Sequence, residues 1–301
     1  MAFNWKTFQT RTLTAIVFAA VMLIGLLWNQ WSFLVLFSVI HFGCWWEYFN
    51  LIEKIHKTKI DNVVKWLFVI CGYTLMIILF FKYITYNFWI GKGDFQLNLK
   101  WTFWVGLLGL LSVFLFQNKT IPYKAKWMCL AGLVYISLSW GLMMNLRNLW
   151  IDFEGFKVIK DFGYTIPILI IASIWINDTM AYIVGSMIGK TQLSKYSPKK
   201  TWEGTIGGFI LSVVLVGFLF RQLAENDLVY PFVQQKTWFI IPAIASVVGT
   251  IGDLFESRLK RMAGVKDSGS LMPGHGGFLD RFDSLLLATP AVWLYVYFLM
   301  R

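Results

Sequence analysis

Long apolar runs recur along the whole chain, and they constrain its fold more than any other feature. Nine of them lie near residues 12–28, 31–49, 63–81, 101–116, 127–144, 165–188, 205–220, 238–252 and 284–300. Several approach the roughly 20 residues with which a helix crosses the hydrocarbon core of a bilayer. In lipid every backbone polar group must pair within its own segment, so helices are the expected structure. We therefore predict an all-α, polytopic integral membrane protein with about nine transmembrane helices.

The composition agrees with this prediction. The chain of 301 residues is 57% hydrophobic and only 14% charged, whereas about a quarter of the residues in an ordinary soluble domain are charged. Residues 1–145 are almost purely apolar, and residues 146–301 carry most of the polar chemistry. We treat the two parts as one membrane-embedded unit with a catalytic C-terminal region.

The distribution of basic residues predicts the orientation. With the N-terminus in the cytoplasm, two thirds of the 27 lysines and arginines fall in cytoplasmic segments, as the positive-inside rule requires. The net charge of +11 is then a topology signal, and no solvated basic domain is present that would indicate a nucleic-acid partner. We expect a multi-pass protein of a bacterial-type cytoplasmic (inner) membrane, with its active site facing the cytoplasm.

The first polar cluster lies in "WINDTMAYIVGSMIGK", residues 175–190. Asp178 stands inside an apolar run, where an ionised carboxylate is costly and therefore indicates function. For Asn177 a helix-packing contact is an equally good reading. Ala181, Gly185 and Gly189 follow at helical spacing, a small-residue stripe that lets another helix approach closely.

The second cluster is "LSKYSPKKTWEGTIGG", residues 193–208. Ser197-Pro198 predicts a turn, and Thr201 is a candidate cap for a helix that starts at Trp202. Lys199 and Lys200 adjoin that helix N-terminus, a position that attracts phosphate. Taken alone, two lysines at a membrane edge are more typical of a topology anchor.

The third cluster begins with "GTIGDLFESRLKR", residues 249–261. If the helix of the eighth run continues to Arg261, one face carries Asp253, Glu256, Ser257 and Lys260 at i, i+3, i+4 and i+7. An acid, a hydroxyl and a lysine on one stripe can carry a divalent metal and a phosphate together.

A glycine-rich loop follows, and the last helix then opens with Asp280 and Asp283. The loop carries Lys266-Asp267 and the Gly274-His275-Gly276-Gly277 run, whose backbone N–H groups can close around an anion. A solvated loop explains these charges but neither the glycines nor the acids on both flanking helices. Carboxylates without a His/Cys cluster favour magnesium over zinc. Such sites catalyse phosphoryl or nucleotidyl transfer, and no P-loop motif indicates an ATPase.

The stretch "SRLKRMAGVKDSGSLMPGHGGFLDRFD", Ser257 to Asp283, closely resembles the signature of the phosphatidate cytidylyltransferases. Every fixed position of that pattern is present: the serine, Lys-Arg, Lys-Asp, His-Gly-Gly and the final Asp-Arg-apolar-Asp. "SPKKTWEG" and "NDT" extend the resemblance to roughly residues 177–284, and "WWEYFNLI" after the second run matches more loosely. Met180 and Ser186 depart from the family pattern and place only local contacts in question.

The resemblance implies a reaction in phospholipid biosynthesis, in which CTP and phosphatidate give CDP-diacylglycerol and pyrophosphate with Mg2+. It leaves open a monovalent cation such as K+ beside the magnesium, and a homodimer. It implies metal binding by Asp253, Asp280 and Asp283. Phosphates are expected on Lys199, Lys200, Lys260, Arg261 and Lys266.

The remaining candidates have less definite roles under the same resemblance. Asp267 and His275 shape the loop or touch ribose or base, and Ser257 is a further metal or phosphate ligand. Arg281 pairs with a carboxylate or binds pyrophosphate. The residues expected to bind substrate also include Gly276, Gly277 and Asp178.

Two rival functions stay in view. One is a related enzyme that uses CTP on another membrane lipid, such as a polyprenyl alcohol or an archaeal lipid phosphate. The other is a transporter with intramembrane acids along an ion path. Transporters often have two similar halves, whereas the polar sites of this chain crowd into one half, which disfavours transport.

Overall fold

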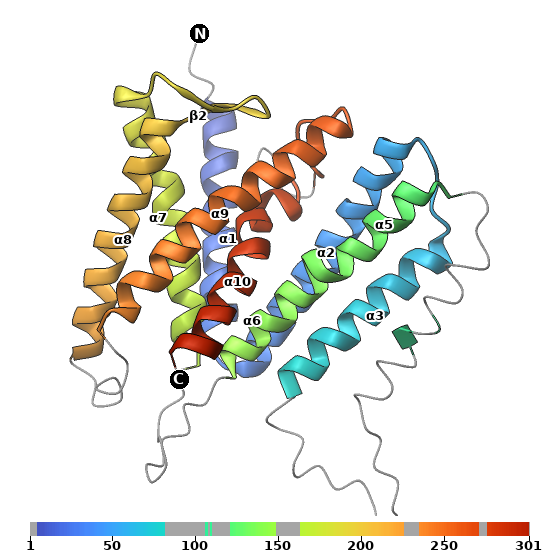
Figure 1. The fold of residues 1–301 in the computed structure, drawn as a ribbon, viewed down its shortest axis with the longest axis horizontal. Coiled ribbons are helices and arrows are strands. Elements are labelled where there is room, and N and C mark those ends of the chain that lie inside the picture. The colour runs from blue at the N-terminus through green and yellow to red at the C-terminus, as the bar shows by residue number, and fades with distance from the viewer. Residues whose placement is uncertain are drawn as a thin grey trace, which may run out of the picture. The chain divides into compact units, whose positions relative to one another are not determined.

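The computed structural model describes residues 5–81, 106–107, 109, 121–148, 163–225, 235–270 and 276–300. Figure 1 shows that these residues are helical except for connecting segments and one short hairpin. Two compact units can be distinguished. The first comprises the described parts of Met1–Asn148 and Met262–Arg281, and the second those of Leu149–Arg261 and Phe282–Arg301.

Within the described residues, seven helices are long and apolar enough to cross a membrane. The expectation of an all-α, multi-pass membrane protein is therefore confirmed. Eight of the nine predicted runs coincide with these seven helices and with α1 (Trp5–Leu27). The run near 101–116 lies almost entirely outside the described residues, so the number nine stays a prediction.

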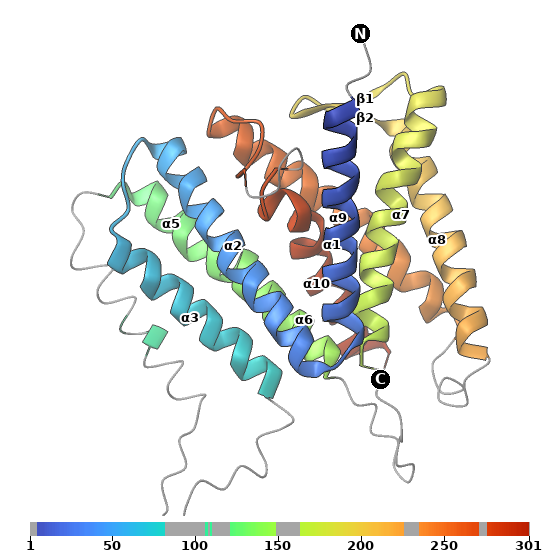
Figure 2. The same ribbon diagram turned by 180° about the vertical axis from the view of Figure 1, so that it is seen from behind.

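The first unit contains α1, α2 (Gln30–His56), α3 (Asn62–Phe81), α5 (Tyr123–Gly132), the π-helix η1 (Leu133–Leu138) and α6 (Ser139–Arg147). The last three form one continuous span, and both views show it beside α2 and α3 (Figures 1 and 2). Asn29 starts α2 with a capping box: its side chain accepts from the N–H groups of Trp31 and Ser32 at 2.8 Å, and Ser32 accepts in return from Asn29 N–H.

Aromatic side chains fill the interior of this unit. The rings of Phe37 and Trp140 lie 5.1 Å apart, and the indole N–H of the fully buried Trp45 donates to Ser137 of η1 at 2.8 Å. The one buried indole donor of α2 thus has a partner in the span it packs against, as a polar group in an apolar core requires.

The second unit contains α7 (Thr165–Ile188), strands β1 (Gln192–Ser194) and β2 (Ser197–Thr201), α8 (Trp202–Glu225), α9 (Thr237–Met262) and most of α10 (Leu279–Leu299). The two strands form an antiparallel hairpin in which Gln192 lies opposite Thr201. Figure 2 shows this hairpin joining the ends of α7 and α8, which lie side by side.

The predicted small-residue stripe on α7 is the surface against which α8 packs. A Cβ added at Gly204 would lie 2.9 Å from the Cα of Gly185, and one at Gly208 would lie 2.7 Å from the Cβ of Ala181. No side chain fits between the two backbones, so the prediction for Ala181 and Gly185 is confirmed. Gly189, the last member of the stripe, faces Thr201 of β2.

Buried serines join three helices of this unit. Ser246 of α9 donates to the hydroxyl of Ser212 on α8 at 3.1 Å, and Ser212 donates to the backbone carbonyl of Ser173 on α7 at 2.8 Å. Hydrogen bonds of this kind hold helices in register in an environment without water.

Candidate functional site

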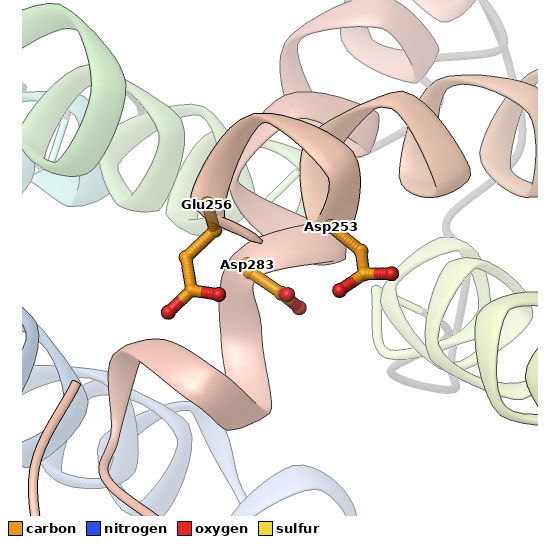
Figure 3. Close-up of side chains that lie close together, drawn as sticks. All are labelled: Asp253, Glu256 and Asp283. Atoms are coloured by element: carbon orange, nitrogen blue, oxygen red, sulfur yellow. The ribbon is translucent and has the colours of Figure 1, made fainter. Parts of the chain in front are cut away.

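Three carboxylates from two helices gather in the second unit. Asp253 and Glu256 project from α9 and Asp283 from α10, and one oxygen of each lies within 4.8 Å of the others. Figure 3 shows the carboxylate of Asp283 between those of Glu256 and Asp253. Glu256 is 0% exposed and Asp283 is 7% exposed. We call these three residues the acidic cluster.

The local sequence explains why the cluster forms. Helix α9 continues beyond its apolar part to Met262, which is the condition under which Asp253 and Glu256 lie one turn apart on one face. At Gly252 the helix meets α10: an added Cβ would lie 2.7 Å from the backbone oxygen of Asp283 and 3.1 Å from the Cα of Ser284. Only glycine allows this approach. The Asp283 carboxylate is held by the Ser284 N–H at 2.6 Å.

Two lysines supply positive charge to the acidic cluster. Lys200 of β2 forms an ion pair with Asp253 and lies 4.0 Å from Asp178 of α7, while Lys260 pairs with Glu256 one turn earlier on α9. Such partners offset part of the cost of burying a carboxylate. The structure therefore brings together five of the predicted site residues: Asp178, Lys200, Asp253, Lys260 and Asp283.

The pKa of Lys200 follows from these neighbours. Burial alone lowers the pKa of an ammonium group, but the carboxylates of Asp253 and Asp178 outweigh it and raise the pKa of Lys200 above its usual range. Lys200 is therefore a permanent cation at neutral pH.

The hairpin presents its two adjacent lysines differently. The turn predicted at Ser197-Pro198 is wrong: both residues lie in β2, and the turn falls at Lys195 and Tyr196. Because neighbouring strand residues point to opposite faces, Lys199 is exposed while Lys200 is half-buried among the carboxylates.

Two side chains hold the hairpin at the start of α8. Thr201 accepts from the Gly204 N–H at 3.2 Å, which confirms the predicted cap. Glu203 accepts from the N–H groups of Lys190 and Thr191 at 3.1 Å. The end of α7 and the start of α8 are thereby tied together, which fixes the strand that carries Lys200.

The last turns of α9 contact the hairpin. Arg261 donates through Nε to the Tyr196 carbonyl at 3.4 Å, and the Arg258 guanidinium lies 5.8 Å from the centre of the Tyr196 ring. Both arginines are exposed, whereas Ser257 is buried. Arg261 therefore stands at the surface of the second unit.

In the first unit, the loop after α9 is organised around two other carboxylates. Glu47 of α2 accepts from the Ser268 hydroxyl at 2.6 Å and from the N–H groups of Phe278 and Leu279 at 2.9 Å. The Asp280 carboxylate accepts from the N–H groups of Ser268 at 2.9 Å and Gly277 at 2.8 Å. Asp280 is thus engaged with the loop, and its expected role as a metal ligand stays a prediction.

The other predicted loop residues are distributed around these contacts. Gly276 has φ +85°, and an added Cβ would lie 2.6 Å from the Asp280 carboxylate. Lys266, Asp267 and Arg281 are exposed. His275 lies outside the described residues.

Two residues of these sites were not assigned a role from the sequence. Glu256 was placed on the correct face of α9 but was left out of the predicted metal ligands. Glu47 had a signal, since it is an acid in an apolar run and belongs to the "WWEYFNLI" segment. Its partners lie 221 to 232 residues further along the chain, which local patterns do not reveal.

Comparison with known proteins gives one consistent family. The family model described as "Cytidylyltransferase family" matches residues 9–299. A phosphatidate cytidylyltransferase of Thermotoga maritima is 43% identical over 138 residues, which is 46% of this chain and 51% of the relative. A phosphatidate cytidylyltransferase of Bacillus subtilis is 35% identical over 195 residues, which cover 64% of this chain and 65% of the relative. A phosphatidate cytidylyltransferase of Brucella abortus is 30% identical over 292 residues, which cover 95% of this chain and 92% of the relative. The alignments thus span half to two thirds of the first two relatives and nearly the whole of the third.

Proposed function

Because this chain belongs to the cytidylyltransferase family, we propose that it is a phosphatidate cytidylyltransferase. It transfers the cytidylyl group of CTP to phosphatidate and yields CDP-diacylglycerol and pyrophosphate. The relatives named above carry this activity in their names.

The observation that carries the proposal is the acidic cluster with a lysine on each side. Asp253, Glu256 and Asp283 gather within 4.8 Å, and Lys200 and Lys260 pair with two of them. A nucleoside triphosphate needs this combination, because its charge is met partly by a divalent cation and partly by fixed ammonium groups. The exposed Lys199, Arg258 and Arg261 add further positive charge on neighbouring surfaces.

The donor set fits magnesium. Every candidate ligand is a carboxylate oxygen, the type that hard divalent cations prefer. Oxygens around Mg2+ lie at about 2.1 Å from the ion, so opposite ligands are about 4.2 Å apart. The 4.8 Å within which the three oxygens gather is close to that span. Bound there, magnesium would neutralise triphosphate charge, and a monovalent cation such as K+ beside it is part of the same proposal.

The chemistry asks little more of the protein than charge and alignment. A phosphate oxygen of phosphatidate is already an anion, so it needs no general base. It forms a bond to the α-phosphorus of CTP, and the bond from that phosphorus to the oxygen of the β-phosphate breaks, which releases pyrophosphate. Lys200 and Lys260 are placed to hold phosphate oxygens during this exchange.

We also propose that the polar ends of α7, α8 and α9 face the cytoplasm, where CTP is available. The positive-inside distribution of lysines and arginines supports this orientation. The acyl chains of phosphatidate then remain in the bilayer while the head group reaches the lysines.

Product analysis with different lipids tests the proposal. Purified protein in detergent is incubated with CTP labelled in the cytosine ring, magnesium, and phosphatidate, diacylglycerol or a polyprenyl phosphate. We expect label in a chloroform-soluble product with phosphatidate alone, and none when EDTA replaces magnesium. Equal or faster labelling of the polyprenyl phosphate would assign the enzyme to another lipid. The absence of any labelled lipid would refute the proposed activity.

A further inference from the structure

Glu47 is a buried acid that the proposed reaction does not use. Glu47 is 6% exposed and lies in the interior of the first unit. A carboxylate is placed there at a high cost in desolvation unless several donors satisfy it. The donors to the Glu47 carboxylate therefore show which segments of the chain this residue holds in place.

Those donors come from both ends of the signature loop. The Ser268 hydroxyl donates to Oε2 at 2.6 Å. The N–H groups of Phe278 and Leu279 donate to Oε1 and Oε2 at 2.9 Å. Because α10 begins at Leu279, these amides are among the helix N–H groups that have no acceptor within the helix. Glu47 therefore caps α10 from α2, and its negative charge faces the positive end of the helix dipole.

The loop is shaped to admit this carboxylate. A Cβ at Gly269 or at Gly277 would overlap the oxygens of Glu47. On α2 itself, a Cβ at Gly43, one turn before Glu47, would overlap the ring of Phe278. Three glycines thus leave the space that the acid and the loop share, which distinguishes the contact from an incidental one.

A second acid completes the arrangement from within the loop. The Asp280 carboxylate accepts from the N–H groups of Ser268 and Gly277, and the Ser268 hydroxyl lies 3.0 Å from it. Ser268 is consequently held by Glu47 and Asp280 together. Lys266 and Asp267 directly precede Ser268, and Asp283 follows Leu279 by one turn of α10.

We propose that Glu47 is a positioning residue for the cytidylyl transfer. By joining Ser268 to the start of α10, it fixes the Lys266-Asp267 pair and the helix that carries Asp283. This inference rests on the proposed function, but its structural part can be tested separately.

The test compares Glu47→Gln with the wild-type protein, as full-length chains purified in detergent. Glutamine keeps the shape of the side chain but loses the charge and one acceptor oxygen. We expect kcat to fall roughly 100-fold, the cost of a misplacement of about 1 Å, and the KM for CTP to rise. A smaller folded fraction would lower the rate without changing KM.

Trypsin should cleave Glu47→Gln after the exposed Lys266 faster than it cleaves the wild type. Glu47→Asp keeps the negative charge, so its KM for CTP should lie closer to the wild-type value than that of Glu47→Gln.

Glu53→Gln is the matched control. Glu53 lies on the same helix and is also satisfied by local partners, Lys65 at 2.8 Å and the Ile60 N–H at 2.7 Å. In the described part of the chain neither of these partners belongs to the loop after α9. We expect this variant to lose some thermal stability while KM and cleavage at Lys266 stay as in the wild type.

These results distinguish the positioning role of Glu47 from the proposed transferase activity. Wild-type values of kcat, KM and Lys266 cleavage in folded Glu47→Gln would overturn the inference. If that variant does not fold, Gly269→Ala replaces it, because its methyl group displaces the same carboxylate, and unchanged kinetics there would overturn the inference equally. A wild-type protein without transferase activity refutes the proposed function instead, and the tryptic comparison then decides the role of Glu47 alone.

Discussion

The ammonium group of Lys200 forms an ion pair with the Asp253 carboxylate, although the first residue belongs to strand β2 and the second to helix α9. The same ammonium lies 4.0 Å from Asp178 on α7. Three elements therefore converge on one lysine. A lysine suited to phosphate is in direct contact with an acid suited to a divalent cation, and a magnesium–triphosphate complex presents both partners together.

Asp283→Asn should abolish activity while the protein still folds. The amide keeps the side-chain shape but loses the charge that a divalent ion requires. We expect a loss of roughly 1000-fold, or about 4 kcal/mol of transition-state stabilisation, which raising CTP does not restore. Activity is measured as a function of magnesium concentration. Asp61→Asn is the control, since the Asp61 side chain accepts from the Val63 N–H at the start of α3, a role that asparagine also fills. Near-normal activity of Asp283→Asn at ordinary magnesium would exclude this residue as a ligand.

Lys200→Met should make stability depend on magnesium. Without the ammonium group, Asp253 and Asp178 lose their common cation, and we expect a loss of about 1–3 kcal/mol in EDTA. A divalent ion bound by the acidic cluster compensates for part of that charge, so the difference in Tm from the wild type should shrink when magnesium is added. A difference that magnesium does not change would count against an ion at this site.

The same pair of proteins gives a pH prediction. The pKa of Lys200 is raised in the folded protein, so its stabilising charge is fully present below the usual lysine pKa of about 10.4. It is lost only as the pH rises through the still higher folded-state pKa. The Tm difference between wild type and Lys200→Met should therefore stay constant from about pH 6 to 9. A difference that disappears across that range would show that Lys200 titrates there.

Gly252→Ala should separate α9 from α10. The added methyl group would meet the backbone of Asp283 at 2.7 Å, and backbone atoms cannot rotate away. We expect about 1–3 kcal/mol of destabilisation together with weaker magnesium activation, measured by thermal unfolding and by titration. Gly249→Ala, one turn earlier, is the control, because its methyl group meets side-chain atoms of Ile174 at 3.2 Å and 3.5 Å. Equal behaviour of the two variants would argue against a special contact at Gly252.

Labelling from either side of the membrane tests the orientation. Gln235 precedes α9 and Ser270 follows it, and both are exposed. The described chain has three cysteines, all buried, which are replaced before single cysteines are introduced. Ser270→Cys should react with an impermeant reagent only from the cytoplasmic side, and Gln235→Cys only from the opposite side. The reverse pattern would overturn the proposed orientation.

The sequence predicted those features that depend on periodicity and local chemistry. A helix that continued beyond the eighth apolar run would place Asp253, Glu256 and Lys260 on one face, and α9 does continue to Met262. Thr201 was recognised as a cap, and Ala181 and Gly185 as a packing stripe, because these depend on neighbours within a few residues or on one helix face.

Features that depend on how separate segments pair with one another were not predicted. Ser197-Pro198 indicated a turn, but pairing with residues 192–194 placed both in a strand. Nothing near Asp280 in the sequence showed that Ser268 and Gly277 would engage its carboxylate. The role of Glu47 was missed for the same reason, since it depends on how α2 packs against residues more than 200 positions away.

The position of the label in CTP distinguishes cytidylyl transfer from phosphoryl transfer. Wild-type protein is incubated with phosphatidate, magnesium and CTP labelled at either the α- or the γ-phosphate. For a cytidylyltransferase we expect the α-label to enter the lipid in a one-to-one ratio with the pyrophosphate released, while the γ-label remains in pyrophosphate. Transfer of the γ-label to lipid, with CDP as the second product, would contradict it, because the chain would then be a CTP-dependent lipid kinase.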